Sequence, residues 1–387
     1  MTCGSRTRTL IVTNDFPPRQ GGIETFVREL ADRFPPEEVV VLTSAPTTTT
    51  DSGESFPYPV IRHRARTLLP TPRATAHAAS VARRYGCDRV WFGAAAPLGL
   101  MAGRLRRTTG IRTAVATTHG HEVWWARTPC ARGLLRRIGT EVDTLTWLGA
   151  STRGPVEAAL APGTRTARLV PGVDTAAFHP ALDGGPTRTR YGLGRRPVIL
   201  CAARLVPRKG QDTLIRALPW VRRAVPDAVL LLVGDGPYAA GLRQLALDEG
   251  VLDSVVFAGG HPHRALPPFY AAADVFAMPC RTRRRGLEVE GLGIVYLEAA
   301  ASGLPVLAGD SGGAPDAVRD GETGHVVDGH SVAATADRLI RLLRNPGLAR
   351  EMGGRGRHWV RTEWTWDRSY ATLRDLLCRP AGSSPGP

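Results

Sequence analysis

Short apolar runs alternate with amphipathic helical segments along nearly the whole chain, and this alternation restricts the fold more than any other feature. Runs typical of buried strands occur at residues 9–13, 39–42, 89–92 and 113–117. A helical periodicity starts near Ile23. Further strands are expected at 198–202, 229–234, 255–258, 275–278, 306–308 and 325–327. Helices are expected at 212–225, at 239–249 and, with a break at 345–347, at 332–378. Repeats of strand, helix and strand predict parallel sheets with helices on both faces.

The two stretches of alternation indicate two domains. Residues 181–196 are rich in glycine, proline and arginine and are expected to be a linker. We therefore predict an α/β protein of two doubly wound, Rossmann-like domains, 1–182 and 183–362, that face a ligand cleft. The C-terminal helix, about 363–378, is expected to pack back on the first domain, and the tail 379–387 is expected to be disordered.

Several classes of protein are disfavoured by composition. No apolar run reaches the roughly 18 residues of a membrane-spanning helix, and the N-terminal segment does not read as a signal peptide. The 6 cysteines are widely spaced, which argues against zinc knuckles and against a disulfide framework. A reducing, cytoplasmic setting is therefore expected.

Positive charge is concentrated in one part of the chain. The formal net charge is +15, and residues 56–137 carry fifteen arginines against two acidic residues. A basic segment confined to one region implies an anionic partner, either a nucleic acid or an acidic membrane surface. A solvated surface with no partner is the alternative.

Lys209 is the single lysine among the 50 basic residues of the Lys+Arg class. It follows the expected strand at 198–202, as does Arg204, and the carboxyl ends of strands face the ligand in this architecture. An ammonium and a guanidinium at this place could neutralise a diphosphate. An ordinary surface pair is the alternative.

Two glutamates, Glu290 and Glu298, flank a glycine-rich entry to an apolar helix. The amides of Gly293, Ile294 and Val295 would form the helix N-terminus, which is a good anion site. Glu298, one turn into the helix, could accept hydrogen bonds from ribose hydroxyls. A helix-capping acid and a surface acid are the alternative.

Two further motifs follow expected strands of the first domain. Gly21 and Gly22 precede the first helix and would let a ligand approach the backbone, although they do not form a dinucleotide fingerprint. His119 lies in Thr118-His119-Gly120-His121-Glu122. The two histidines and the glutamate are too close together for a full metal shell, so no metal site is predicted.

Together these motifs resemble the GT-B retaining glycosyltransferases of family 4. Within that family the chain resembles the actinobacterial phosphatidylinositol mannosyltransferases, and most of all the type that adds the second mannose to phosphatidylinositol monomannoside. The resemblance covers about residues 10–377. The segments that carry it are 12–23, 91–98, 118–123, 204–212 and 289–295. Two segments depart from the family pattern: Arg283-Arg284-Arg285, and the stretch 148–153, which lacks an expected tyrosine.

The resemblance implies the roles of the candidate residues. Arg204 and Lys209 would hold the diphosphate of GDP-mannose, Glu298 the ribose and Glu290 the mannose hydroxyls. His119 would lie at the reacting sugar, and the catalytic residues would be His119, Arg204, Lys209 and Glu290. The remaining donor-binding positions are Gly21 and Gly22 by the phosphates, and Gly293, Ile294 and Val295 at the helix N-terminus. The loop Gly312-Gly313-Ala314-Pro315 would lie near the donor.

The resemblance also implies the setting of the reaction. The acceptor would be a phosphatidylinositol glycolipid, and the enzyme would be peripheral on the cytoplasmic face of the plasma membrane. Its basic segment would lie on the anionic inner-membrane surface, with Trp124 and Trp125 as interfacial anchors. The reaction is expected to need no metal or other cofactor, because two cations and a helix N-terminus can stabilise the leaving diphosphate.

Two other readings remain open on the sequence. The chain could be a family 4 enzyme with another nucleotide-sugar donor, such as a UDP-sugar, or a soluble acceptor. It could also be a basic nucleic-acid-binding protein. That reading predicts a recognisable binding module with aromatic residues among the basic ones, and the sequence shows neither, so no nucleic acid partner is expected.

Overall fold

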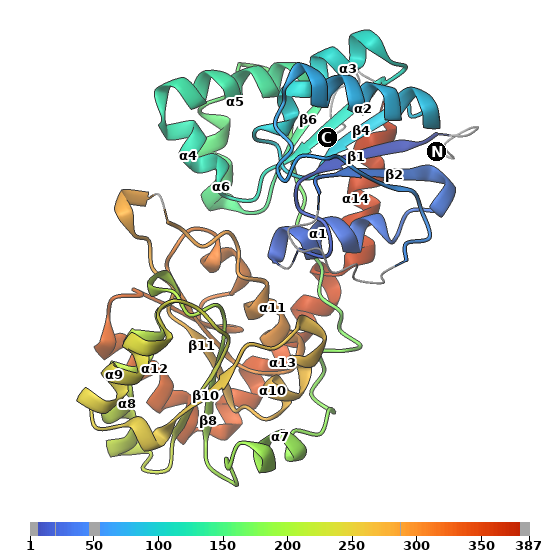
Figure 1. The fold of residues 1–387 in the computed structure, drawn as a ribbon. Helices are drawn as coiled ribbons and strands as arrows, with labels where there is room; N and C mark the ends of the chain where they lie inside the picture. The colour runs from blue at the N-terminus through green and yellow to red at the C-terminus, as the bar shows by residue number, and fades with distance from the viewer. Residues whose placement is uncertain (1–6, 20, 46–54, 287, 380–387) are drawn as a thin grey trace. The chain divides into compact units, whose positions relative to one another are not determined.

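The computed structural model describes residues 7–19, 21–45, 55–286 and 288–379 and divides into two compact units (Figure 1). The first unit is Met1–Gly172 with Trp366–Pro387, and the second is Val173–Thr365. The expected domain boundary was after residue 182, ten residues further on. The presumed linker 181–196 lies inside the second unit because it folds there: it contains α7 (Gly185–Arg190), and Leu193 is fully buried. Of the expected tail 379–387, residues 380–387 lie outside the described residues.

The first unit is built on a seven-stranded parallel sheet with the order β3-β2-β1-β4-β5-β6-β7. Four of its strands match the expected runs: β1 (Thr9–Thr13), β2 (Val39–Thr43), β4 (Arg89–Phe92) and β5 (Thr113–Thr117). The others are β3 (Val60–Arg62), β6 (Thr144–Trp147) and β7 (Thr166–Arg168). The four matching strands are buried throughout, which is why they read as continuous apolar runs.

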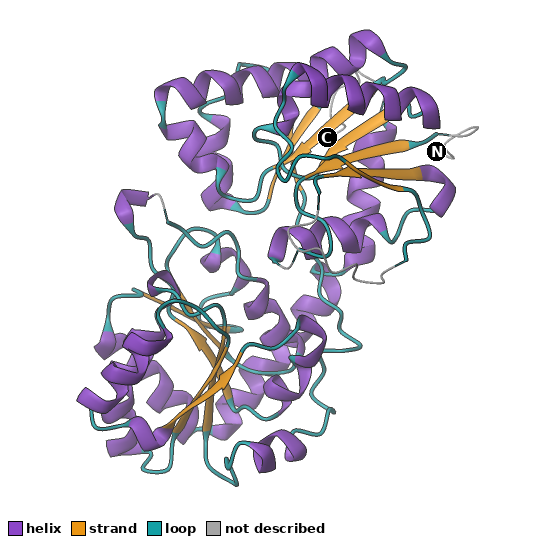
Figure 2. Ribbon diagram, in the orientation of Figure 1, coloured by secondary structure: helices purple, strands orange, loops and turns teal. Residues whose placement is uncertain are grey.

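Helices cover both faces of this sheet (Figure 2). One face packs Leu10, Val90 and Ala114 of the strands in one apolar core with α2 (Pro72–Tyr85), α3 (Ala102–Thr108) and α5 (Pro129–Glu141). On the other face Trp91 meets Phe26 of α1 (Gly22–Ala31), with ring centroids 6.3 Å apart. Two short helices complete the unit, α4 (Glu122–Arg127) and α6 (Ala150–Glu157).

The C-terminal helical stretch breaks twice rather than once. The expected break at 345–347 separates α12 (Val332–Arg344) from α13 (Pro346–Glu363). A second break, at Trp364 and Thr365, releases α14 (Trp366–Cys378), which belongs to the first unit and contacts α1, β4 and β5. The ring of Trp366 lies 6.0 Å from that of Phe26. Burial of this aromatic pair fixes α14 on the α1 face of the sheet.

The second unit contains a six-stranded parallel sheet with the order β10-β9-β8-β11-β12-β13. Its strands are β8 (Val198–Ala202), β9 (Val229–Val233), β10 (Val255–Gly259), β11 (Val275–Met278), β12 (Val306–Gly309) and β13 (Gly324–Val327). Besides α7, α12 and α13, its helices are α8 (Gln211–Ala224), α9 (Ala239–Asp248), α10 (Pro267–Ala271) and α11 (Ile294–Ala301). The prediction of two doubly wound parallel sheets is therefore confirmed. No helix among the described residues is long and apolar enough to cross a membrane.

Each sheet has a point at which the strand order reverses. In the first unit it lies between β1 and β4, and in the second between β8 and β11. Since every pairing is parallel, the loops after these strands meet at one edge of each sheet. Ligands of doubly wound proteins bind at that edge. The predicted site residues follow β1 and β5 in the first unit, and β8, β11 and β12 in the second.

Two adjacent glycines of α13 give a test of this packing. A Cβ on Gly353 would lie 1.9 Å from the Gly303 carbonyl oxygen, whereas a Cβ on Gly354 would meet nothing within 4 Å. We expect Gly353→Ala to destabilise the protein by about 2 kcal/mol through overpacking. Gly354→Ala should stabilise it by about 1 kcal/mol through helix propensity. Denaturant unfolding of both variants measures the difference, and a shift of the same sign in both would contradict the packing of α13 on this backbone.

Candidate active site

A buried ion cluster lies at the carboxyl edge of the second sheet. The short turn Pro207–Lys209 follows β8 and brings Lys209 Nζ to 2.6 Å from Glu290 Oε2. Arg208 Nη1 lies 2.9 Å from the same oxygen. Glu290 is 7% exposed, so its carboxylate is stabilised mainly by these two cations and little by water.

Glu290 is ionised at neutral pH. Burial by itself raises the pKa of a carboxyl group, but the charges and hydrogen bonds of Lys209 and Arg208 outweigh it and lower the pKa of Glu290 below its ordinary value. The sequence interpretation assigned Lys209 and Glu290 to different parts of one ligand, and the structure places them in direct contact. Arg208 was not assigned a role, although it precedes Lys209 directly.

Close backbone contacts hold this cluster in place. Gly210, at φ 78°, ends the Lys209 turn, and a Cβ there would lie 2.0 Å from the Pro279 carbonyl oxygen. Beyond β12, Gly313 N–H donates to the Glu290 carbonyl at 2.9 Å, and a Cβ on Gly312 would lie 2.0 Å from that same oxygen. The predicted loop 312–315 therefore packs on the backbone of Glu290, and only glycine allows this approach.

Arg204 is exposed on the same edge, two residues beyond β8. Its carbonyl accepts a hydrogen bond from Gln211 Nε2 at 3.1 Å, but its guanidinium has no partner among the residues that the structure describes. The guanidinium of Arg204 therefore makes no polar contact with the described residues that stabilises the fold, and it is available to bind an anionic ligand.

Helix α11 starts where the sequence predicted. Gly293 is its N-cap, at φ 79°, and Ile294 and Val295 are its first two residues. Tyr296 N–H donates to the Gly293 carbonyl at 3.0 Å, whereas the amides of Ile294 and Val295 have no intrahelical acceptor and lie close to Glu290 in the chain. This arrangement can bind an anion.

Glu298 is 1% exposed and already has protein partners. Tyr270 donates its hydroxyl to Oε2 at 2.7 Å, and His263 Nε2 lies 2.6 Å from Oε1. Neither partner was foreseen, because both come from a different loop and helix. Each carboxylate oxygen has two lone pairs, so one further bond to each remains feasible. The ribose-binding role of Glu298 stays a prediction.

In the first unit, His119 follows β5 and is held by two hydrogen bonds. Its Nε2 lies 2.6 Å from the Gly93 carbonyl, and its backbone N–H donates to Glu122 Oε2 at 2.9 Å. Because a carbonyl only accepts, Nε2 carries the proton and Nδ1 is left as an acceptor. Burial lowers the pKa of His119, despite the opposing effects of Glu122 and of the bond to Gly93. A neutral imidazole with Nδ1 unprotonated can accept a hydrogen bond from a sugar hydroxyl.

Gly21 and Gly22 are exposed at the start of α1. Gly21 is in an extended conformation, at φ 167°, and a Cβ on Gly22 would meet nothing within 4 Å. The fold itself therefore does not require glycine at position 22, and the role of Gly22 beside a ligand stays a prediction.

The possible metal site at Thr118-His119-Gly120-His121-Glu122 is not formed. Glu122 is fully buried and bonds the His119 backbone, while His119 Nε2 faces Gly93. Within the described parts of the chain, no three histidine, cysteine or acidic side chains lie together as metal ligands would. The expectation that the reaction needs no metal remains untested.

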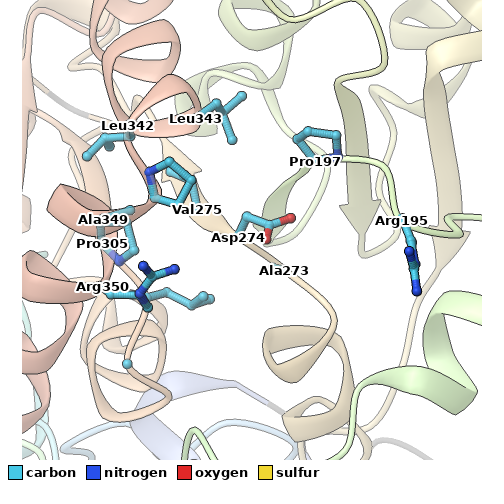
Figure 3. A pocket seen from close by; sticks show the side chains of 13 residues that line it. Arg195, Pro197, Ala273, Asp274, Val275, Pro305, Leu342, Leu343, Ala349 and Arg350 are labelled. Carbon is cyan, nitrogen blue, oxygen red and sulfur yellow. The ribbon is translucent and has the colours of Figure 1, made fainter.

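A cavity of about 270 Å³ lies at the opposite, amino edge of the second sheet (Figure 3). Pro197, Val275 and Pro305, at the starts of three strands, line it together with residues of α12 and α13. Its one carboxylate, Asp274, is already bonded by Val198 N–H at 2.8 Å and Arg188 Nη2 at 2.9 Å. It contains none of the predicted site residues.

Two Rossmann-like units, with glycine-rich loops and a buried Lys–Glu pair at the carboxyl edge of one sheet, fit the GT-B class of glycosyltransferases. Comparison with known proteins agrees. Residues 20–177 match the model Glycosyltransferase Family 4, and residues 188–359 match Glycosyl transferases group 1.

Relatives that match along nearly the whole chain show which glycosyltransferases it resembles. The chain is 49% identical over 95% of its length to the GDP-mannose-dependent alpha-(1-6)-phosphatidylinositol monomannoside mannosyltransferase of Mycolicibacterium smegmatis, and covers 97% of that protein. It is 46% identical to the Corynebacterium glutamicum enzyme named for the monoacylated form of that acceptor, over 96% of this chain and 97% of the relative. The chain belongs to the family of these glycosyltransferases.

Solved structures agree on the fold. Alr3699/HepE from Anabaena, in complex with UDP, superposes with a TM-score of 0.81 at 18% identity, covering 96% of this chain and 99% of its own. Sucrose-phosphate synthase from Thermosynechococcus elongatus gives 0.78 at 23% identity, covering 95% of this chain and 98% of its own.

The contribution of the Lys209–Glu290 pair to the stability of the protein should depend on pH. We expect Lys209→Gln to destabilise the protein by about 3 kcal/mol at pH 7, because the buried carboxylate loses its nearest cation. The pKa of Glu290 is lowered on folding, so its stabilising effect is present above its ordinary value of 4.5 and lost as pH falls through the lowered value. The difference between wild type and variant should therefore shrink in acid.

Denaturant unfolding from pH 7 downward measures this difference. Arg216→Gln serves as the control, since its pair with Glu249 is half exposed at 51% and 29% of the side chains. That variant should lose at most about 1 kcal/mol. A Lys209→Gln effect that is independent of pH would show that the ammonium does not stabilise ionised Glu290.

Proposed function

We propose that this protein is a retaining mannosyltransferase that transfers mannose from GDP-mannose to phosphatidylinositol monomannoside in an α-1,6 linkage. The reaction would be an early step of phosphatidylinositol mannoside and lipomannan synthesis. The observation that carries the proposal is the identity of 46–49%, over 95–96% of the chain, to enzymes whose names state this reaction. The residues of the candidate active site are suited to it.

The proposed chemistry follows from charge. The bond between the mannose anomeric carbon and the diphosphate breaks, and a bond to the acceptor hydroxyl forms on the same face. The acceptor proton passes to a diphosphate oxygen, and GDP leaves. Lys209, Arg204 and the first-turn amides of α11 would stabilise the leaving diphosphate without a metal.

Carboxylate and imidazole groups would orient the sugars. Glu290, kept ionised by its two cations, would accept hydrogen bonds from mannose hydroxyls, and Glu298 from the ribose. His119 would accept through Nδ1 from a hydroxyl of the reacting sugar. Such positioning, and not covalent chemistry by the protein, would supply most of the rate enhancement.

The first experiment is transfer of label from GDP-mannose to phosphatidylinositol monomannoside in neutral mixed micelles that contain EDTA. We expect a labelled dimannoside. Lys209→Ala and Glu290→Ala should each lower kcat by about 100-fold or more, because each removes a group that acts on the transition state. Circular dichroism confirms that the variants are folded, and Arg216→Gln is the control.

Other outcomes assign other functions. Label on unmannosylated phosphatidylinositol would keep the donor and change the acceptor. Turnover of UDP-glucose but not of GDP-mannose would keep the fold and overturn both substrates. Wild-type rates in the Lys209 and Glu290 variants would refute the assigned site.

The proposal includes binding to the anionic inner surface of the plasma membrane. The exposed residues of α4 and α5 include Arg127, Arg132, Arg136 and Arg137 together with the apolar Trp124 and Leu134. A basic helix face that carries exposed apolar residues suits the headgroup region of an anionic bilayer. Trp125, the other expected anchor, is only partly exposed because it packs against the core.

Neutralising part of this face tests the membrane role. We expect Arg127→Gln with Arg136→Gln to weaken binding to phosphatidylinositol-containing vesicles by about 30-fold, which corresponds to roughly 1 kcal/mol per arginine. GDP binding should not change. The matched control is Arg341→Gln with Arg344→Gln, which removes two exposed arginines of α12. Equal vesicle binding by the two double variants would remove the membrane argument.

A further inference from the structure

A strained turn in the loop between β11 and α11 carries two arginines at its tip. Arg283 and Glu288 form a short antiparallel bridge, with N–H···O distances of 2.9 and 3.2 Å, and Gly286 N–H closes the turn on the Arg283 carbonyl at 3.1 Å. Between them lie Arg284 at φ 51° and Arg285 at φ 55°. They are the only non-glycine residues with positive φ among those that the structure describes.

The backbone does not favour arginine at these two positions. The left-handed region brings Cβ close to the following carbonyl, so glycine or asparagine adopts it at lower cost than arginine does. Strain of this kind persists where the residue has another use.

Packing and ion pairing do not account for the two side chains either. Arg285 is exposed and has no partner within the described residues. Arg284 reaches Glu288 at 3.1 Å, but its side chain is 71% exposed, and Arg283 contacts the same carboxylate at 3.3 Å. Two guanidinium groups therefore share the Glu288 carboxylate and that of Arg285 has none among the described residues, which leaves a surplus of positive charge at the tip.

The position of the tip indicates which anion it can reach. Two residues after Glu288 the chain reaches Glu290, which lies in the ion cluster with Lys209. Arg285 precedes Glu290 by five residues, which span at most about 18 Å of extended chain. The diphosphate of the donor already has cations of its own there, in Lys209 and Arg204. The two arginines at the tip are therefore better suited to an anionic group of the acceptor than to the diphosphate of the donor.

We propose that Arg284 and Arg285 bind the phosphodiester of the lipid acceptor. This inference rests on the proposed function, since that acceptor carries a phosphodiester between inositol and glycerol. Planar guanidinium groups match phosphate oxygens with paired, charge-assisted hydrogen bonds. The tip is then a specificity determinant for a phosphorylated acceptor, and it is separate from the groups that hold the donor.

The test replaces both residues by ones that suit the turn, Arg284→Asn with Arg285→Gly. The variant should unfold at the same temperature as the wild type or higher, because the backbone strain is relieved. In neutral detergent micelles, KM for phosphatidylinositol monomannoside should rise about tenfold or more as charge-assisted bonds are lost. Affinity for GDP-mannose should stay within twofold. Arg284→Lys with Arg285→Lys keeps the charge and should recover part of the KM effect.

Direct binding gives a readout that does not depend on turnover. Monomeric dioctanoyl phosphatidylinositol should bind the wild type more tightly than dioctanoylglycerol does, and the Asn/Gly variant should lose this preference. Arg341→Gln with Arg344→Gln, which removes the same charge from α12, should keep it.

The outcomes separate this inference from the proposed function. A wild type that transfers no mannose to the lipid refutes the proposed function, whereas a wild type that transfers normally and a variant with unchanged KM refute the tip alone. Loss of GDP-mannose affinity in the variant would assign the tip to the donor and overturn the proposal. If the Asn/Gly variant lost only its binding to anionic vesicles, the tip would bind the bilayer surface, and the proposal would likewise be overturned.

Discussion

A carboxylate removed from water must be paired or neutral, and Glu290 is paired twice, with Lys209 and with Arg208. Burying the Lys209–Glu290 pair beside the partly exposed Arg208 needs good geometry, and the loops after β8, β11 and β12 all meet at Glu290. Lysine suits this position because its ammonium is compact and can approach one oxygen closely while remaining a donor to others. A diphosphate arriving here would meet a cation already positioned by the protein, at little cost in reorganisation.

Close approaches of backbone to backbone make this convergence possible. Gly210 lies against Pro279, and Gly312 and Gly313 lie against Glu290 and Gly291, in each case where a Cβ would overlap a carbonyl oxygen. These glycines therefore have a steric function, unlike Gly22, which has open space around it. The contrast separates glycines that the packing of the site requires from one that the packing does not require.

Arginine serves at least three different purposes in this chain. Arg281 is buried and makes paired bonds to Asp212 at 2.6 and 2.8 Å, which ties the loop after β11 to α8. On α4 and α5, arginines form an exposed basic face. At the turn of Arg284 and Arg285, they occupy a backbone conformation that does not suit them. Arginine stabilises the fold in the first case and destabilises it in the last. The environment of each arginine therefore decides what it does.

Much of this protein could be predicted from local sequence. Buried parallel strands are short and apolar throughout, so β1, β4, β5, β8 and β11 were found within a residue of their bounds. Glycine before an apolar helix likewise located the start of α11. The short strand β3 was missed because its residues are only partly buried. The domain boundary was placed late because a Gly/Pro-rich segment reads as a linker even when, as at Leu193, it packs into a core.

The chemical character of the site also came from the sequence, because residue type and position after a strand restrict what a loop can bind. The partners of each residue did not. That Lys209 pairs with Glu290, that Tyr270 and His263 hold Glu298, and that Gly93 selects the tautomer of His119 are contacts between residues 26 to 81 positions apart. No local pattern encodes such distances. They arise because parallel strands bring the loops at their carboxyl ends to the same edge of a sheet, and only the tertiary structure decides which side chains meet there.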